Sequence, residues 1–539
     1  MTAAHAAGRA PATLRPNLTT RGASGGQATG ARIPRLAPIH LAVLVSLLAG
    51  LAVRLIDLDK NPPGFFCDEA SIGYNAYSLL TTGKDQWGTP FPLFFRAFGE
   101  YKNPLDIYFT VPLIAAFGLT EFSVRLTSVI FSGLSMLALY GLGSAIGNRA
   151  LGLTWLSVFA ITPWSIHISR SNLEGLNILV FFTVLSLIFI TRFMRAGRTR
   201  DLVLFSASSA LATYAYFPAR ILIPLFVTVI AGYLVFSRGG RTAACAGAIY
   251  LVLVLPLLQH LSSETGLARW QQVSMFNQPG VDPVRKLVES YLLHFSPDFL
   301  FVQGDSGMPG QAVTRHSVAG IGELYRWQAV FLVVGAYAAI RAGPAAWLPV
   351  FTLLLLYPLP SSLTSDLAPQ ATRSVAGIIP LTLLTGYGIG YLLENVSEER
   401  RYLGLAVRAA VIGVGLYSFV GFLQLQKQYP SYAADFWGWQ YGPRDIVRTF
   451  LDEKDQYDEL YMTGSFNAPE IFLNFYDPHR TCSNCFVGGL ERWSKQKRQL
   501  FALRVEEVPT NGRGSLLVKK VLTYPNGTEA FYIGEWSGE

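Results

Sequence analysis

The sequence predicts an α-helical polytopic membrane protein with a small α+β domain at its C-terminal end. Only 14% of the 539 residues are charged, whereas soluble domains average about 25%. Several windows of about 20 residues are nearly free of charge, which is the length that crosses a hydrocarbon core. After Leu423 the composition becomes charged and soluble-looking. These observations predict about eleven transmembrane helices with juxtamembrane helices, followed by an extracytoplasmic domain.

The net charge of +8 and the four cysteines restrict the class of function. Much of the positive charge lies in short loops, where Lys and Arg orient membrane helices, so it does not indicate nucleic-acid binding. Cys67 and Cys245 are isolated. Cys482 and Cys485 form a single CxxC pair, which does not support a zinc site without a second pair. A local disulfide in an oxidising compartment and two free thiols both remain as interpretations.

The N-terminal third of the chain begins with a tail and a first loop. Residues 1–36 carry five Arg and no acid, and they predict a disordered cytoplasmic tail. Residues 38–56 are the first predicted membrane helix, and the basic tail keeps the N-terminus inside. The loop 57–121 then lies outside. Within it, residues 69–80 have apolar side chains at helical spacing before Gly83, which predicts a short amphipathic helix on the membrane surface.

Basic loops decide the predicted topology. They lie at Asn148-Arg149, Arg195–Arg200, Arg238–Arg241 and Arg341, and the positive-inside rule places them in the cytoplasm. The later spans then alternate as 122–146, 150–166, 176–194, 201–217, 219–237, 242–262, 326–341, 344–361, 374–394 and 402–423. Because the first of these must start outside, the apolar segment 104–119 is predicted not to cross. It should form a juxtamembrane or re-entrant helix on the outer face.

The same topology gathers charged side chains on the outer face. It places the turn 163–177, the long loop 260–326, the turn 216–220 and the segment 360–373 outside. Charged groups at the ends of spans are costly unless they are paired or used. Those that share this face are Asp68, Glu69, Lys102, Arg170, Glu174, Arg220, Arg315, His316 and Arg373. Their joint placement indicates a functional site.

The C-terminal residues 425–539 are predicted to form the soluble α+β domain, which an odd number of spans places outside. Residues 445–454 predict a helix, and the predicted strands are 459–463, 500–508, 515–523 and 530–535. Pro525-Asn526-Gly527 is a hairpin turn between the last two strands. No internal repeat is visible in the chain.

An acidic pair beside several cations suits one reaction. A carboxylate can take a proton from an acceptor hydroxyl while cations stabilise a departing phosphate. Phosphate is already a good anionic leaving group and needs no general acid, in contrast to the leaving group of a glycosidase. A site embedded in a membrane implies that the phosphate is attached to a lipid.

Six of these nine outer-face residues also have a structural interpretation. Asp68 precedes a helical segment, where Asp is a favoured N-cap. Lys102 and Arg220 could snorkel from the interface. Arg170 and Glu174 are four residues apart and could form only an ion pair. A single His such as His316 is more often structural than functional, and the aromatic residues of the loop could form an interfacial belt.

The residues at the outer face carry a resemblance to a known superfamily. Its stretches are Asp68-Glu69, Tyr101-Lys102-Asn103-Pro104-Leu105, Glu121-Phe122-Ser123-Val124-Arg125-Leu126, and Ser169-Arg170 with Glu174. The sequence resembles the GT-C fold glycosyltransferases that use polyprenyl-phosphate sugars, namely the protein O-mannosyltransferases and the bacterial aminoarabinose lipid A transferases. The resemblance covers roughly residues 40–400 and is most specific between 65 and 180. Ala371-Thr372-Arg373-Ser374 and Trp439-Gln440-Tyr441-Gly442 also resemble bacterial members.

The resemblance implies roles for individual residues. Asp68 corresponds to the proposed base of the family. Glu174 corresponds to a second acidic residue that approaches the site, where the family usually has Asp. Lys102 corresponds to the Lys of a Lys-Pro-Pro motif near the lipid phosphate, although Asn103 replaces the first Pro. Two juxtamembrane helices in the first outer loop agree with the two predicted in the loop 57–121. Related oligosaccharyltransferases need a divalent metal, but many members of this branch are not known to.

These inferences predict an inverting hexosyl- or pentosyltransferase in the inner (plasma) membrane, with a glycosyltransferase domain over residues 37–424. It would move a sugar from a polyprenyl-phosphate donor to a glycan, lipid or protein acceptor on the periplasmic side. The expected catalytic residues are Asp68, Glu69 and Glu174. The expected phosphate ligands are Lys102, Arg220, Arg315, His316 and Arg373, and the expected substrate contacts are Tyr74, Tyr101 and Arg170. No cofactor is required, and a divalent metal stays open as an alternative that no ligand cluster compels.

Two other classes of function fit part of the pattern. A transporter or flippase of lipid-linked sugars would show pseudo-repeats and polar residues at mid-membrane, whereas the charges here lie at one face. A glycan ligase or polymerase that uses a diphosphate-linked oligosaccharide differs only in its donor. The Asp-Glu pair with Lys-Asn-Pro favours monophosphate sugars.

Overall fold

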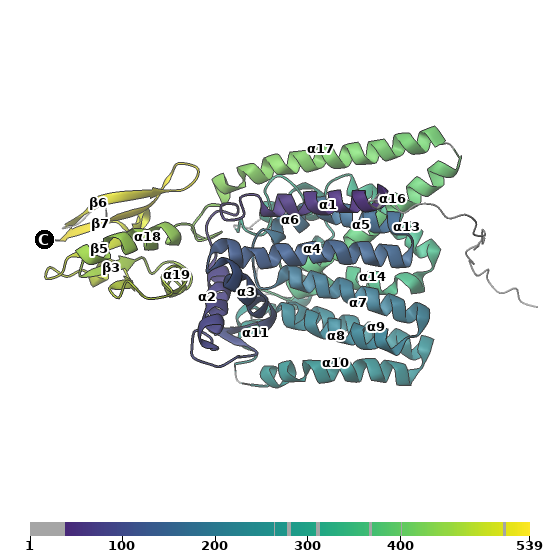
Figure 1. Cartoon of the computed structure of the whole chain (residues 1–539), viewed down its shortest axis with the longest axis horizontal. Helices are drawn as coiled ribbons and strands as arrows, with labels where there is room; N and C mark the ends of the chain where they lie inside the picture. The colour runs from purple at the N-terminus through teal and green to yellow at the C-terminus, as the bar shows by residue number, and fades with distance from the viewer. Residues whose placement is uncertain are drawn as a thin grey trace, which may run out of the picture.

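A bundle of roughly parallel helices carries a β-sheet region at one end, here named the sheet end (Figure 1). The computed structural model describes residues 38–538 except residues 264, 278–281, 309–312, 366–368, 400 and 510–513. The predicted tail 1–36 lies outside the described residues. Helix α1, the first described helix, packs against α5 and α4 at the edge of the bundle, and the C-terminus lies in the sheet region (Figure 1).

The bundle helices match the predicted segments. They are α1 (Pro38–Leu55), α4 (Glu121–Ile146), α5 (Arg149–Ile161), α7 (Leu176–Ala196), α8 (Thr199–Ala215), α9 (Ala219–Arg238), α10 (Gly240–Leu261), α13 (Gln328–Ala342), α14 (Pro344–Leu356), α16 (Ile378–Glu399) and α17 (Arg401–Ala433). Among the described residues, eight helices are long and apolar enough to cross a membrane, or nine if one bent pair is a single span. The prediction of a multi-span membrane protein is therefore confirmed. The eleven predicted transmembrane helices, however, exceed the eight or nine that meet this length and apolarity.

The difference has local causes. Helices α8 and α13 have 17 and 15 residues, fewer than the roughly 20 that cross a bilayer without adjustment. The predicted span 150–166 is broken, because α5 and α6 (Pro163–Ser169) meet at 62°. Pro163 starts α6, and a proline cannot donate the hydrogen bond that would continue the preceding helix.

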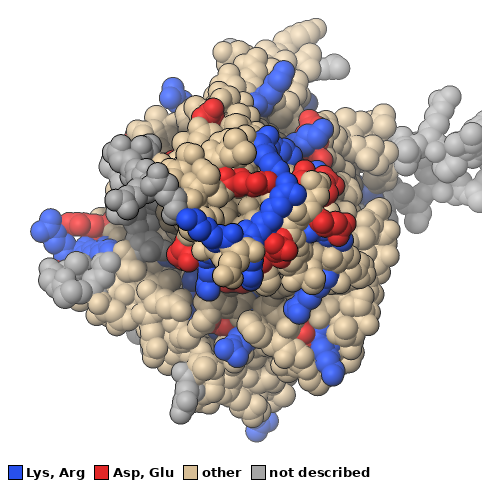
Figure 2. All heavy atoms as spheres, turned by 90° about the vertical axis from the view of Figure 1, so that its left-hand side faces the viewer, with Lys and Arg blue, Asp and Glu red and all other residues tan. Residues whose placement is uncertain are grey.

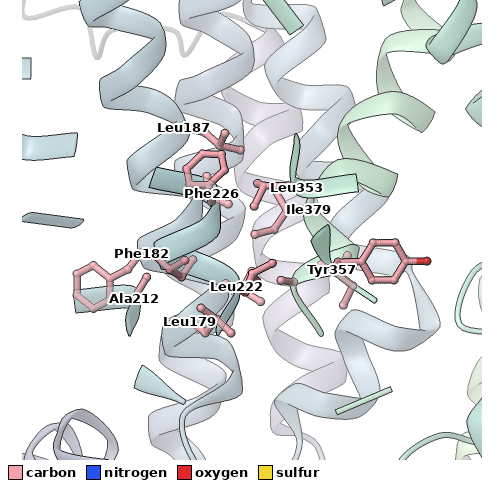
Figure 3. Packing of buried hydrophobic residues seen from close by; sticks show 14 of the residues in the cluster. Leu179, Phe182, Leu187, Ala212, Leu222, Phe226, Leu353, Tyr357 and Ile379 are labelled. Atoms are coloured by element: carbon pink, nitrogen blue, oxygen red, sulfur yellow. The ribbon is translucent and has the colours of Figure 1, made fainter. Parts of the chain in front are cut away.

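Apolar side chains from several bundle helices interlock to form the core. Leu179 of α7, Leu222 and Phe226 of α9, Leu353 of α14 and Ile379 of α16 are buried and converge in Figure 3. Polar residues in the short turns cap some of the helix ends. Asn148, for example, accepts a hydrogen bond from the Leu151 amide and caps α5.

The first loop folds over the sheet end of the bundle (Figure 1). It contains α2 (Cys67–Thr82), a two-stranded antiparallel hairpin of β1 (Phe95–Ala97) and β2 (Glu100–Lys102), and α3 (Pro104–Phe117). The predicted helix at 69–80 is confirmed, and Gly83 ends it in the left-handed conformation at φ 70°. Helix α3 packs against α2 and α4. Its 14 residues span about 21 Å, less than the hydrocarbon core of about 30 Å.

The long loop and the remaining connections supply short elements. These are α11 (Ala268–Val273), α12 (Pro283–Leu293), α15 (Leu359–Ser362), a π-helical turn (Asp298–Val302) and 3₁₀ turns at Met275–Asn277, Asp305–Gly307, Val375–Gly377, Lys454–Gln456, Leu490–Arg492 and Val505–Glu507. Helix α11 is held by backbone hydrogen bonds from Ser365 to Val273 and from Met275 to Leu363. It thereby forms a wall of the sheet end.

The C-terminal region is a five-stranded mixed sheet with helices. Its strands are β3 (Glu459–Met462), β4 (Cys485–Val487), β5 (Gln499–Arg504), β6 (Gly514–Thr523) and β7 (Glu529–Gly538), in the order β4-β3-β5-β7-β6. Helices α18 (Pro443–Glu453) and α19 (Glu470–Tyr476) pack on it, and α19 contacts α2. The predicted strands and the hairpin are confirmed. Strand β4, with three residues beside the Cys482–Cys485 disulfide, gave no sequence signal.

Close packing of α13 on α16 gives a testable prediction. A Cβ at Gly335 would lie 1.9 Å from the Leu384 carbonyl oxygen, so Gly335→Ala forces the two backbones apart. We expect a loss of about 1–3 kcal/mol, seen as a lower Tm in detergent. The matched control is Gly413→Ala on α17, where a Cβ meets nothing within 4 Å. Equal Tm values for the two variants would contradict this packing.

Candidate functional site

A cavity of about 760 Å³ lies at the sheet end, and three acids and three arginines are among the residues that line it. The lining comes from α2 and the residue before it, the β1–β2 hairpin, the 173–174 turn, Tyr216, α11, residues 313–316, Ser365, residues 370–373 and the C-terminal region. Its side chains are Phe66, Asp68, Phe98, Glu100, Leu173, Glu174, Tyr216, Arg269, Gln272, Val273, Val313, Arg315, His316, Ser365, Gln370, Thr372, Arg373 and Asn467. Seen from the sheet end, Lys, Arg, Asp and Glu side chains gather on this face of the molecule (Figure 2).

Lys102 joins two carboxylates at this cavity. Its Nζ lies 2.6 Å from Asp68 Oδ1 and 3.0 Å from Glu174 Oε1. Burial alone would lower the pKa of Lys102, but the Asp68 and Glu174 carboxylates raise it above its ordinary value. Burial likewise opposes ionisation of Glu174, yet Lys102 and Arg269 hold the pKa of this carboxyl below its usual range. The lysine is charged and in contact with two acids.

Local backbone structure places each member of this trio. Lys102 ends strand β2, opposite Phe95 in the hairpin, and Pro104 starts α3 two residues later. Glu174 has a left-handed backbone at φ 53°, and Gly175 follows at φ 76°. A Cβ on Gly175 would lie 2.5 Å from the Ala215 carbonyl oxygen, so only glycine fits there. Such strained positions recur at functional sites, where the surrounding packing maintains them.

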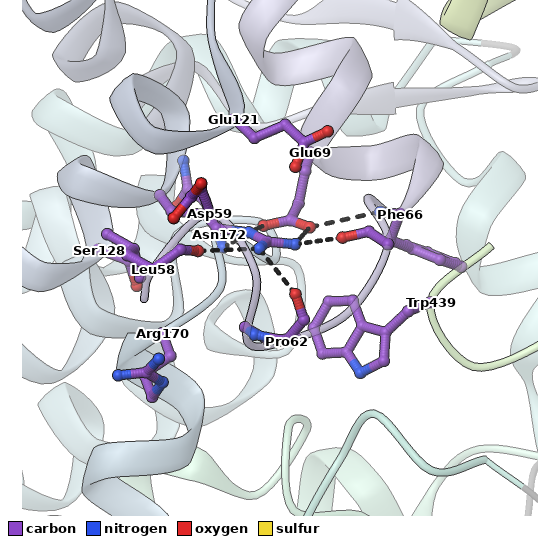
Figure 4. Close-up of polar contacts among 12 residues, drawn as sticks. Leu58, Asp59, Pro62, Phe66, Glu69, Glu121, Ser128, Arg170, Asn172 and Trp439 are labelled. Carbon is purple, nitrogen blue, oxygen red and sulfur yellow. Dashed lines mark hydrogen bonds and ion pairs between the residues drawn. The ribbon is translucent and has the colours of Figure 1, made fainter. Parts of the chain in front are cut away.

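Glu69 belongs to a buried network and not to the cavity lining (Figure 4). Its Oε1 and Oε2 lie 2.9 and 3.0 Å from Arg125 Nε and Nη2, and the Asn172 amide donates to Oε1. The Phe66 amide donates to Oε2, so Glu69 is the carboxylate that caps α2. Asp68 is the second residue of α2. The interpretation of Asp68 as an N-cap is therefore wrong.

Two residues predicted to bind phosphate lie together on another wall. Arg315 Nη1 donates to the carbonyl oxygens of Trp437 and Gly438 at 3.0 and 3.2 Å, and its guanidinium lies 4.0 Å from the centre of the Phe66 ring. His316 Nδ1 lies 3.2 Å from Asp305 Oδ2. Burial lowers the pKa of both Arg315 and His316. Arg373, also predicted, lines the same cavity.

Six predicted residues lie outside the cavity lining: Glu69, Lys102 and the four described next. Arg220 donates to Asn103 Oδ1 at 2.8 Å, so it supports the end of β2. Arg170 donates to carbonyl oxygens at the end of α1 and in the following turn, including those of Ile56 and Asn61, and Glu174 pairs with Lys102 instead. The predicted pair of Arg170 and Glu174 is therefore wrong. Tyr74 of α2 is partly buried against the core, and Tyr101 contacts the ring of His260.

The sequence reasoning missed Glu100, Arg269 and Asn467. Arg269 Nε lies 3.2 Å from Glu100 Oε2, and both side chains line the cavity. Burial, together with the Glu174 carboxylate, raises the pKa of Glu100 to about 7 against the opposing effect of Arg269. One signal could have found Glu100: it stands two residues before Lys102 on a strand, so the two side chains share a face.

The described residues offer no cluster suited to a metal ion. No group of three or more His, Cys, Asp and Glu side chains in this part of the chain has a metal-binding arrangement. The Asp68 and Glu174 carboxylates of the cavity share the Lys102 ammonium.

Comparison with protein families and solved structures shows which known proteins the chain resembles. Residues 102–261 match the family described as dolichyl-phosphate-mannose-protein mannosyltransferase. ArnT from Cupriavidus metallidurans bound to undecaprenyl phosphate gives a TM-score of 0.58 at 14% identity, over 92% of this chain and 98% of that chain. The oligosaccharyltransferase AglB from Archaeoglobus fulgidus, in complex with an inhibitory peptide and a dolichol-phosphate, gives 0.54 at 10% identity, over 81% and 63%. No curated protein sequence gives a significant match.

The chain is a multi-span membrane protein that is similar in fold to these two proteins. The likeness to ArnT and AglB shows this fold, and the family match begins at Lys102 and includes Glu174. The predicted resemblance to glycosyltransferases that use lipid-phosphate sugars is confirmed.

The Glu100 carboxyl gives a pH-dependent prediction. Its pKa of about 7 in the folded chain lies above the ordinary value of 4.5, so the folded state binds this proton more tightly than the unfolded state. The stability that Glu100 contributes is therefore present below about pH 4.5 and is lost as the pH rises through 7. We expect the Tm of the wild type to fall relative to Glu100→Gln between pH 5 and 7.5.

Thermal unfolding in detergent at half-unit pH steps measures this difference. The matched control is Glu289→Gln on exposed helix α12, whose Tm should follow the wild type throughout. A constant offset between wild type and Glu100→Gln over the whole pH range would contradict the prediction.

Proposed function

We propose that the chain transfers one sugar from a polyprenyl-phosphate donor to a hydroxyl of its acceptor, with inversion, and that Asp68 is the general base. The observation that carries this proposal is the contact of Asp68 and Glu174, which line the cavity, with one buried Lys102 behind them, while arginines line other parts of the same cavity. The cavity lies where the apolar bundle meets the sheet region. This position suits a lipid whose phosphate is polar and whose tail is not.

The cations of the cavity would bind the donor phosphate. Lys102, Arg315 and Arg373 are the ligands inferred from the sequence, and Arg269 joins them because it lines the same cavity. An incoming phosphate would compete with Asp68 for Lys102. The carboxylate would then be released to accept a proton from the acceptor. His316 would support this wall through Asp305, and Arg220 would act through Asn103.

The reaction needs one base and no acid. Asp68 removes the proton of the acceptor hydroxyl as its oxygen attacks the anomeric carbon. The bond from that carbon to the phosphate oxygen breaks, and polyprenyl phosphate leaves as an anion held by the cations. Attack opposite the leaving group inverts the anomeric centre. Glu174 keeps Lys102 oriented after Asp68 has been released, and Glu69 acts by placing α2.

We propose that no metal cofactor takes part. In an acid-rich glycosyltransfer site, a cation must compensate the carboxylates and the developing charge on the phosphate. The Lys102 ammonium contacts both carboxylates here, and the arginines face the same cavity. These groups can supply that compensation.

The topology follows from the same interpretation. Eleven bundle helices would cross the inner (plasma) membrane, with the N-terminus in the cytoplasm, and the loops 57–121 and 260–326 and the region 425–539 would lie in the periplasm. Helix α13 packs along α16 and would cross, whereas α3 lies beside α2 at the sheet end and would not (Figure 1). Acceptors of glycan, lipid or protein type could then approach from the periplasm.

Removing the base tests the proposed reaction. Asp68→Asn keeps the size of the side chain and leaves the Lys102–Glu174 pair in place, but an amide cannot accept the proton. We expect transfer from a labelled polyprenyl-phosphate sugar to fall about 100-fold or more, while donor binding persists. Asp452→Asn on the exposed face of α18 is the matched control. Full transfer by a folded Asp68→Asn variant would contradict the assignment.

Cysteine labelling tests the position of α3. In a Cys245→Ser background, Thr120→Cys places a thiol between α3 and α4, and Arg198→Cys places one between α7 and α8. If α3 does not cross, an impermeant maleimide should label residue 120 in intact cells and residue 198 only after lysis. Labelling of residue 120 only after lysis would mean that α3 spans the membrane.

A further inference from the structure

The turn at residues 437–442, here named the tryptophan turn, lies against the start of α2. Gln440 within it is 2% exposed and has a left-handed backbone at φ 49°. The turn leaves no space at Gly64, where a Cβ would lie 2.6 Å from the Trp439 carbonyl oxygen. A strained, buried and polar side chain persists only where its surroundings fix it.

Gln440 connects the start of α2 to a second segment of the C-terminal region. Its Oε1 accepts a hydrogen bond from the Cys67 amide at 2.9 Å, and its Nε2 donates to the Asn467 carbonyl oxygen at 3.1 Å. Asn467 Nδ2 in turn lies 3.4 Å from Cys67 Sγ. These three contacts form a closed ring. Cys67 directly precedes Asp68, so the ring lies beside the proposed base.

Asn467 is the contribution of the C-terminal region to the cavity. Among the described residues that line it, every other one precedes residue 374. The side chain of Asn467 is exposed, and its Oδ1 accepts no hydrogen bond from the part of the chain that the structure describes. An amide carries a donor and an acceptor but no charge. It therefore suits a hydroxyl group better than the donor phosphate.

We propose that Asn467 binds the hydroxyl-bearing acceptor, and that Gln440 is a positioning residue that holds both Asn467 and the helix turn of Asp68. This inference rests on the proposed glycosyl transfer and adds to it the part of the chain that selects the acceptor. Because Asp68 would take the proton of the acceptor, the acceptor hydroxyl would enter the cavity that Asp68 and Asn467 both line. The cations Lys102, Arg269 and Arg373, which are proposed to bind the phosphate, all precede the C-terminal region in the chain.

Steady-state kinetics can separate acceptor binding from donor binding. The assay uses full-length protein in detergent, a labelled polyprenyl-phosphate sugar extracted from source cells, and the envelope fraction of those cells as the acceptor. We expect Asn467→Ala to raise the acceptor KM about ten-fold, the worth of one hydrogen bond, and to leave the donor KM within two-fold. Asn474→Ala, in the same region and outside this cavity, should match the wild type.

Gln440→Ala should change both kcat and the acceptor KM. It removes the acceptor for the Cys67 amide and the donor to Asn467, so kcat should fall about ten-fold and the acceptor KM should rise, with the donor KM unchanged. A variant that only destabilised the protein would lower the amount of active enzyme without changing the acceptor KM. In the double variant that combines Gln440→Ala with Asn467→Ala, the acceptor KM should rise no more than in Asn467→Ala alone.

The outcomes distinguish this inference from the proposed function. An unchanged acceptor KM in Asn467→Ala would overturn the inference, as would an equal rise in Asn474→Ala. If transfer by the wild type is lost in Asp68→Asn while Asn467→Ala is normal, the proposed function stands and only this inference fails. A wild type that transfers no label from the donor overturns both.

Discussion

The buried pair of Glu69 and Arg125 determines where helix α2 begins. Both side chains have no exposed surface, and a buried charge without partners costs several kcal/mol. Arg125 also donates to the carbonyl oxygens of Leu58, Pro62 and Gly64. The segment 58–64, α2 and α4 therefore form one unit (Figure 4). Consecutive helical residues point about 100° apart, so a fixed Glu69 also directs Asp68 toward the cavity and Lys102.

The same constraint explains why two adjacent acids have different surroundings. Glu69 has four hydrogen-bond donors on its oxygens and no contact with the cavity. Asp68 keeps 22% of its side chain exposed, and Glu174 keeps 17%. Lys102 donates a hydrogen bond to each of these two carboxylates, and a phosphate can compete for its ammonium group. An acid buried like Glu69 cannot exchange its partner without a large loss of stability. The different degrees of burial therefore explain the different roles proposed for Asp68, as the base, and Glu69, which positions α2.

The sequence predicted the helical segments well, because long apolar stretches identify them without reference to other parts of the chain. It also indicated the cluster of Asp68, Lys102 and Glu174 at one end. It failed where a partner depends on tertiary packing. Arg170 and Arg125 look alike as single cations near helix ends, yet one caps α1 and the other pairs with Glu69. The start of α2 lies two residues earlier than predicted, since periodicity leaves helix boundaries uncertain by that amount.

Two residues with strained backbone conformations support the candidate site. Glu174 and Gln440 both have left-handed backbones, which cost about 1–3 kcal/mol each. Packing of Gly175 on α8 maintains the first, and packing of Gly64 on the tryptophan turn maintains the second. Arg444 and Tyr476 bind Glu121 at the start of α4, so the C-terminal region is attached where Arg125 also acts. The sheet region is therefore a structural part of the site: if it moved away, the contacts that hold the turn of Asp68 would be lost.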